Sequence, residues 1–423
     1  MNLTRSRLAQ QTLVTWATLV SALLFLFCAR ALVARDLGPT AMGVYVLMLT
    51  VALLGGTFLS LGLPAYNAAF AQQERPDVLL ANCLLWNGFV FCVLSIVCPL
   101  VFMFAGLPRA RAFLLLGVWM APLMSMMECL RGVLQGSGSM RAYNVVGFIG
   151  GALNLTAVAV LSMTGRLGLG AAAVCWVGSV VASLLVGIYG FSRGKGLARP
   201  DVRLLGRSLK FGGQAWLSQM TGVLNIRLAL VLIEWLLGTA AVGIYSIGAT
   251  ISEGLLYLPY AVAAVTAPRF ANATRLDAAR LLVRAGAAVF AVNAVIGIVL
   301  GLLADPLVPL VFGPQYAGAV PILRALLPGI VIYGPIAVAA WYFNAHLKRP
   351  AINLVVVGFS AACGWIFIAL LAPRFGLVGV GIATSCSYVA AAILNVVLLR
   401  RTSDLSYARF LEAARFERQR GVA

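Results

Sequence analysis

Twelve mostly apolar stretches follow one another along this chain, separated by short polar segments. A membrane-spanning helix needs about 20 consecutive apolar residues, and each stretch is long enough. Hydrophobic residues make up 62% of the chain and charged residues 10%, whereas a soluble domain carries about 25% charged residues. We therefore predict an all-α polytopic membrane protein with twelve transmembrane helices. The candidate spans are residues 10–33, 40–62, 79–105, 112–134, 143–164, 168–191, 211–235, 240–265, 281–303, 321–344, 351–372 and 377–399.

Two similar nonapeptides lie 200 residues apart. Residues 37–45 read LGPTAMGVY and residues 237–245 read LGTAAVGIY, with five of nine positions identical. Each copy lies between the first two spans of a set of six, so the chain is predicted to be two copies of one unit. Such doubling is typical of transporters, with the substrate path between the halves. We predict two pseudo-symmetric six-helix lobes of parallel topology around a central cavity.

The repeat itself is interpreted as structural. Gly38 and Gly238 each follow the end of a span, where a residue with positive φ is favoured. The two sets of six spans and the polar segment between them divide the chain into an N-terminal lobe (1–191), a basic cytoplasmic linker (192–208), a C-terminal lobe (209–400) and a basic tail (401–423).

Basic residues set the expected orientation. With the N-terminus in the cytoplasm, most of the 31 basic residues fall on the cytoplasmic side, as the positive-inside rule requires. Both termini are then cytoplasmic. The tail from Ser403 to Gln419 is expected to be an interfacial amphipathic helix, with a solvated tail as the alternative.

Composition also argues against several classes of function. The net charge of +19 is spread between apolar stretches and forms no block, so no nucleic-acid partner is expected. The eight cysteines form no C-x-x-C pair and lie almost entirely in apolar stretches, and His346 is the single histidine. We expect no metal site and no cofactor.

Charged side chains within spans are costly and tend to face a cavity, so they are candidate substrate-binding residues. Arg30 lies near the end of the first span, and Arg227 lies in the seventh span, which is its counterpart in the second half. The 200-residue offset places the two arginines about one helical turn apart in the aligned halves. They are predicted to face each other across the pseudo-twofold axis and bind phosphate, because the planar guanidinium donates hydrogen bonds in pairs.

The seventh span also has a polar face. Helical spacing places Gln214, Ser218, Thr221 and Asn225 on one side, which is the predicted cavity lining. Hydrogen bonding between helices is the alternative interpretation.

Two acidic residues lie well inside spans and are candidate ion-coupling residues. Glu128 is three positions before Arg131, so the alternative is a simple pair on one helix. Glu253 has no basic residue three or four positions away. It is predicted to contribute to cation coupling by exchanging a proton during the transport cycle, or to balance Arg227.

Four motifs, in order along the chain, resemble one known family. They are residues 34–45 (ARDLGPTAMGVY), 130–136 (LRGVLQG), 311–319 (VFGPQYAGA) and 375–379 (FGLVG). Together with the span count and the doubling, they resemble the polysaccharide-biosynthesis branch (oligosaccharide and O-antigen flippases) of the multidrug/oligosaccharidyl-lipid/polysaccharide (MOP) superfamily. The resemblance implies a MATE-like fold. The short predicted outer loops and the lack of a carboxylate pair or nucleotide motif predict no enzymatic activity.

The resemblance further implies export of undecaprenyl-diphosphate-linked oligosaccharide across the bacterial inner membrane, for O-antigen (lipopolysaccharide), capsule or exopolysaccharide. Its partners would be the lipid-linked substrate and the bilayer. Further candidate partners are a coupling proton or sodium ion and a polymerase or glycosyltransferase. The alternative within the superfamily is a multidrug or toxin cation antiporter, which the two arginines disfavour. A membrane polysaccharide polymerase or ligase is a weaker alternative, because the predicted outer loops are short and carry no carboxylate pair.

Overall fold

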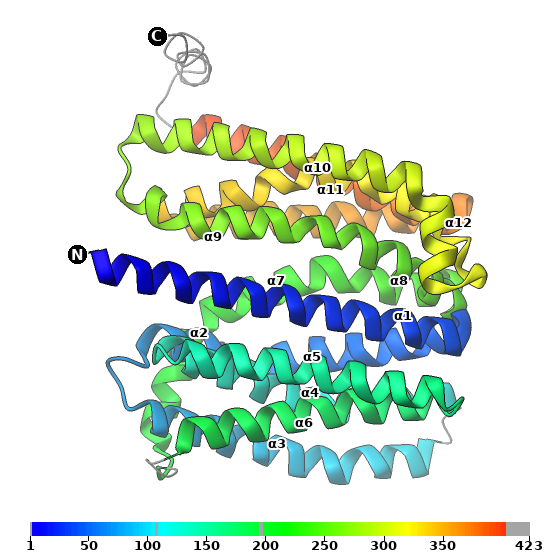
Figure 1. The fold of residues 1–423 in the computed structure, drawn as a ribbon, viewed down its shortest axis with the longest axis horizontal. Coiled ribbons are helices and arrows are strands. Elements are labelled where there is room, and N and C mark those ends of the chain that lie inside the picture. The colour runs from blue at the N-terminus through cyan, green and yellow to red at the C-terminus, as the bar shows by residue number, and fades with distance from the viewer. Residues whose placement is uncertain (1, 106–108, 194–197, 403–423) are drawn as a thin grey trace. The chain divides into compact units, whose positions relative to one another are not determined.

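The computed structural model describes residues 2–105, 109–193 and 198–402, and all the secondary structure in these ranges is helical (Figure 1). The tail predicted to form an interfacial helix lies outside the described residues. The helices are α1 (Asn2–Ser60), α2 (Leu63–Phe70), α3 (Pro76–Ala105), α4 (Arg109–Gly136), α5 (Met140–Met163), α6 (Leu169–Ser192), α7 (Val202–Leu237), α8 (Thr239–Glu253), the 3-10 turn η1 (Gly254–Leu256), α9 (Tyr257–Asn272), α10 (Arg275–Phe312), the 3-10 turn η2 (Pro314–Tyr316), α11 (Ala319–Trp341), the π-helical turn η3 (Tyr342–His346) and α12 (Pro350–Thr402).

Among the described residues, ten helical segments are long and apolar enough to cross a membrane, so the chain is a multi-pass membrane protein. Two of them contain two predicted spans each. Residues 10–33 and all but the last two residues of 40–62 lie in α1, on either side of the non-helical Gly38. Residues 351–372 and 377–399 both lie in α12, around the non-helical Gly376. That the chain crosses the membrane twelve times stays a prediction.

The chain separates into two compact units, Met1–Val223 and Leu224–Ala423. The boundary lies within α7, and the predicted linker of residues 192–208 overlaps the start of that helix. The lobe and linker limits proposed from the sequence therefore stay predictions.

In the first unit α4 is the central helix. It packs against α1, α2, α3, α5 and α6. Glycines allow the closest contacts: a Cβ added at Gly132 of α4 would overlap the Pro64 backbone, and one added at Gly56 of α1 would meet the Met124 Cβ at 2.5 Å. Small residues of this kind let membrane helices approach closely where apolar solvent provides no driving force for association.

In the second unit α11 has the same role. It packs against α8, α9, α10 and α12. The spans in α4 and α11 are each the fourth of their predicted set of six, so the two units share one packing plan. At the end of α11, the His346 ring stacks on Tyr342 with centroids 5.3 Å apart, and its Nδ1 lies 3.1 Å from the Phe270 carbonyl. The single histidine therefore connects α9 with the end of α11.

The first glycine of each nonapeptide has the predicted positive φ. Gly38 has φ 71° and ψ 173°, and Gly238 has φ 85° and ψ 172°. This region of backbone space is essentially restricted to glycine. Two chain breaks of the same conformation, 200 positions apart, show the repeat at the level of the backbone.

Candidate functional site

Arg30 lies in the first half of α1, eight residues before the break at Gly38, and its side chain is half-buried. Its guanidinium interacts electrostatically with the Tyr45 phenol, which follows the break, and Cys175 of α6 is a further neighbour of that phenol. Tyr45 is 4% exposed. The break at Gly38 therefore brings a cation and a buried hydroxyl-bearing ring together within the first unit.

The polar face of α7 crosses the boundary between the two units. Ser218 is exposed, and Thr221 and Asn225 are half-buried; the Gln214 side chain lies outside the described residues. The Thr221 hydroxyl donates to the Leu217 carbonyl of its own helix at 2.7 Å. The Thr221 hydroxyl therefore needs no hydrogen bond to another helix. A cavity-lining role for the face stays a prediction.

Arg227 is half-buried and belongs to the second unit. Arg30 belongs to the first unit, so their predicted opposition across an axis stays a prediction.

Glu253, the last residue of α8, lies among tyrosines of the second unit. Its carboxylate interacts electrostatically with Tyr245 of α8, Tyr260 of α9 and Tyr388 of α12. The half-buried carboxylate thus interacts electrostatically with phenol groups from three helices. We call Tyr245, Glu253, Tyr260, Tyr333 and Tyr388 the tyrosine cluster.

Two direct contacts fix this cluster. The Tyr333 and Tyr388 rings have centroids 4.5 Å apart, and the Tyr245 and Thr384 hydroxyl oxygens are 3.4 Å apart. These contacts join α8, α11 and α12 around the carboxylate. The cluster combines a carboxyl group with aromatic side chains, a combination that suits a small cation.

The other candidate acid is paired. Arg131 donates to the Glu128 carboxylate at 3.0 Å, three residues apart on α4. This contact confirms the alternative interpretation, in which Glu128 and Arg131 form a simple pair on one helix. It weakens the assignment of Glu128 to ion coupling. Arg324 likewise donates to the Asp305 carboxylate at 2.6 Å.

The family-like motif at residues 311–319 forms a turn. Gly313 has φ 103°, and the buried Tyr316 lies in η2 between α10 and α11. Burial raises the pKa of Tyr316, so this phenol stays neutral. The motif therefore shapes a connection between helices.

The tyrosine cluster was not predicted from the sequence, because its members are up to 143 positions apart (Tyr245 and Tyr388). One signal was present: Tyr45 and Tyr245 are the last residues of the two nonapeptides. Each of them lies near the in-span charge of its own unit, Arg30 or Glu253. The repeats, interpreted as structural, therefore also contribute a residue to each candidate site.

Several solved structures have the same fold as this chain. An inward-facing multidrug resistance MATE family transporter of the MOP superfamily has a TM-score of 0.70 at 16% identity, with 94% of this chain and 96% of that chain covered. The lipid II flippase MurJ in an inward closed conformation has a TM-score of 0.72 at 12% identity, covering 96% and 90%. A MOP superfamily transporter from Pyrococcus furiosus, described as having a binding pocket of reverse polarity, has a TM-score of 0.62 at 17% identity, covering 97% and 96%. The chain has the fold of MOP-superfamily transporters.

Sequence comparison gives the family. Residues 8–274 match the family model described as "Polysaccharide biosynthesis protein". The chain belongs to this family, which confirms the resemblance seen in its motifs. No curated protein matches its sequence.

Proposed function

We propose that this protein flips an undecaprenyl-diphosphate-linked oligosaccharide across the bacterial inner membrane by alternating access. The oligosaccharide would be a repeat unit of O-antigen, capsule or exopolysaccharide. Membership of the polysaccharide biosynthesis family supports the glycan pathway, and the fold shared with a lipid II flippase supports a flipping activity.

The observation that carries the proposal is Arg30. A half-buried guanidinium in a membrane-spanning helix is costly unless an anion or a polar partner uses it. A diphosphate accepts paired hydrogen bonds from guanidinium groups, and Arg227 would add a second cation from the other half of the repeat. The exposed and half-buried polar residues of α7 would contact the sugar.

The test is glycan export in a strain that lacks the chromosomal gene. Arg30→Ala and Arg227→Ala, each inserted at wild-type levels, are expected to lower export about tenfold to a hundredfold and to cause cytoplasmic build-up of lipid-linked glycan. The matched control is Arg166→Ala, which removes an exposed arginine from the α5–α6 connection. Wild-type export by both variants would overturn the assignment.

The tyrosine cluster supports a proposal for energy coupling. A proton or sodium ion would bind at Glu253 and leave it during each transport cycle, with the surrounding phenol groups stabilising the bound state. Glu128 is a weaker candidate because Arg131 already neutralises it.

One observation favours a second function, the multidrug or toxin cation antiporter. Organic cations bind well to a carboxylate among aromatic rings, and Glu253 has such surroundings. Ethidium accumulation in cells separates the two functions. A flippase leaves accumulation unchanged, whereas an antiporter lowers it in a manner that Glu253→Gln abolishes.

A further inference from the structure

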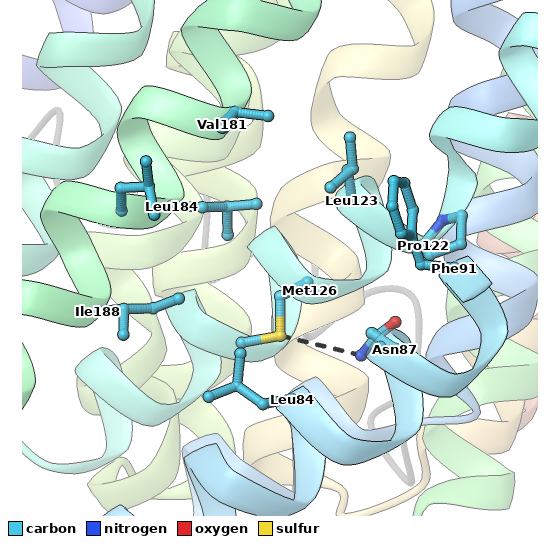
Figure 2. A pocket seen from close by; sticks show the side chains of 11 residues that line it. Leu84, Asn87, Phe91, Pro122, Leu123, Met126, Val181, Leu184 and Ile188 are labelled. Carbon is cyan, nitrogen blue, oxygen red and sulfur yellow. Dashed lines mark hydrogen bonds between the residues drawn. The ribbon is translucent and has the colours of Figure 1, made fainter. Parts of the chain in front are cut away.

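The first unit contains an apolar crevice between α3 and α6, with α4 as its floor. Both α3 and α6 pack against α4, and the space between them has a volume of about 250 Å³. Figure 2 shows side chains from all three helices around this space. Its walls and floor include Leu84, Phe91, Leu123, Met126, Leu184 and Ile188.

The crevice opens on a surface that faces hydrocarbon. Gly88 and Leu185 line it and are exposed, and a Cβ added at Gly88 would meet no atom within 4 Å. The neighbouring α3 side chains Leu85 and Phe89 are also exposed, at 45% and 64%. Gly88 is twelve residues into α3, about 18 Å along the helix, which is mid-depth in a hydrocarbon core about 30 Å thick.

The lining selects a hydrocarbon ligand. A cavity lined by apolar side chains stays dry and takes apolar molecules. Asn87 is the single polar side chain of the lining and is 4% exposed. Its nitrogen donates to the Cys83 carbonyl at 2.9 Å and is turned toward the Met126 sulfur (Figure 2), whereas its oxygen has no hydrogen-bond partner among the described residues. One acceptor is too little to bind a polar headgroup.

We propose that this crevice holds part of the isoprenoid chain of the lipid-linked substrate. This inference rests on the proposed function, which supplies a long hydrocarbon chain that stays in the bilayer while the diphosphate and sugar cross. A chain anchored at the membrane surface by its diphosphate reaches mid-depth with its first few units. Its methyl branches give it an irregular outline that fits between leucine, isoleucine and phenylalanine side chains, as core residues interdigitate. The crevice belongs to the same unit as Arg30, so one unit would hold both parts of the substrate.

Photolabelling of the full-length protein in nanodiscs tests the occupant. The probe is a polyprenyl diphosphate with a diazirine in its chain, and labelled residues are located by mass spectrometry. We expect labels on the crevice-facing residues of α3, α4 and α6, competed by unlabelled polyprenol. A diazirine-bearing phosphatidylglycerol at the same mole fraction should label the crevice far less. Equal labelling by the phospholipid would mean that the crevice holds annular lipid and would overturn the proposal.

Filling the crevice provides the matched variants. Gly88→Phe places a ring in open space at the mouth, so crevice labelling should fall at least about tenfold, or about 1.4 kcal/mol. Gly190→Phe is the control, because Gly190 of α6 is exposed, has equal space and lies outside the lining. Asn87→Leu should keep or increase labelling, since it replaces a side chain whose buried oxygen has no hydrogen-bond partner among the described residues with an apolar one. Unchanged labelling in Gly88→Phe, or loss of labelling in Asn87→Leu, contradicts a hydrocarbon occupant.

Export measured on the same variants separates this inference from the proposed function. If the polyprenyl probe labels the crevice but deletion of the gene leaves glycan export intact, the crevice is an isoprenoid site and the flippase proposal is overturned. Normal export by a wild-type protein that shows no crevice labelling would keep the flippase and overturn the crevice.

Discussion

At the scale of single residues, the buried Tyr45 phenol is expected to help position the Arg30 guanidinium, with which it interacts electrostatically. The substitution Tyr45→Phe keeps the buried ring and removes the hydroxyl that interacts with the guanidinium. The loss of one such interaction predicts export reduced about twofold to tenfold at unchanged protein levels. The control is Tyr189→Phe on α6, whose ring is 65% exposed. Equal export by wild type and Tyr45→Phe would limit Tyr45 to a packing role.

The two acids inside spans predict opposite results for coupling. Glu253 interacts electrostatically with phenol groups, whereas Glu128 accepts a hydrogen bond from Arg131 at 3.0 Å. In proteoliposomes with an imposed proton or sodium gradient, Glu253→Gln should remove the dependence of transport on the gradient. Glu128→Gln should keep this dependence, even if leaving Arg131 without its partner lowers the amount of folded protein. Gradient dependence in Glu253→Gln would exclude Glu253 as the coupling residue.

At the scale of elements, the helix breaks at Gly38 and Gly238 predict that any side chain at these two positions destabilises the protein. An added Cβ at Gly38 or Gly238 meets no atom within 4 Å, so the cost of alanine there comes from backbone conformation alone. Such a conformation costs about 1–3 kcal/mol for a non-glycine residue. Gly38→Ala and Gly238→Ala should therefore each lower the apparent melting temperature in detergent.

The matched control is Gly147→Ala in α5, where φ is helical and space is equally free. Alanine favours a helix over glycine by about 1 kcal/mol, so this variant should be neutral or more stable. A similar loss of stability in all three variants would show that the positive φ values are not the cause.

The helices could be predicted from the sequence because each depends on a local property. A run of apolar residues determines a span, and the i,i+3 spacing of Glu128 and Arg131 is enough to predict their contact. The candidate site could be predicted only in part. Tyr245 and Thr384 meet across 139 positions, and the crevice needs Asn87, Met126 and Leu184 from three helices. No local pattern contains such contacts, since they arise from how helices pack around α4 and α11.

At the scale of the whole molecule, the lengths of α1 and α12 bear on the number of crossings. With 59 and 53 residues, each would be about 80–90 Å long if straight, nearly three times the hydrocarbon core of about 30 Å. Each is broken at one glycine, Gly38 or Gly376. We therefore expect two crossings per helix, with the breaks at the outer surface, which would give twelve spans and keep the basic loops in the cytoplasm.

Single cysteines at exposed positions test this count and the orientation together. Asp36 and Arg374 lie two residues before the breaks, and Gln72 and Arg349 lie in or near the connections at the opposite ends of these segments. A membrane-impermeant maleimide added to intact spheroplasts should label Asp36→Cys and Arg374→Cys. It should label Gln72→Cys and Arg349→Cys only after the membrane is permeabilised, with wild-type protein as the baseline for the eight native cysteines. If α1 crossed once, an N-terminal tag and Gln72→Cys would be found on opposite sides, and the parallel topology of two six-span halves would be wrong.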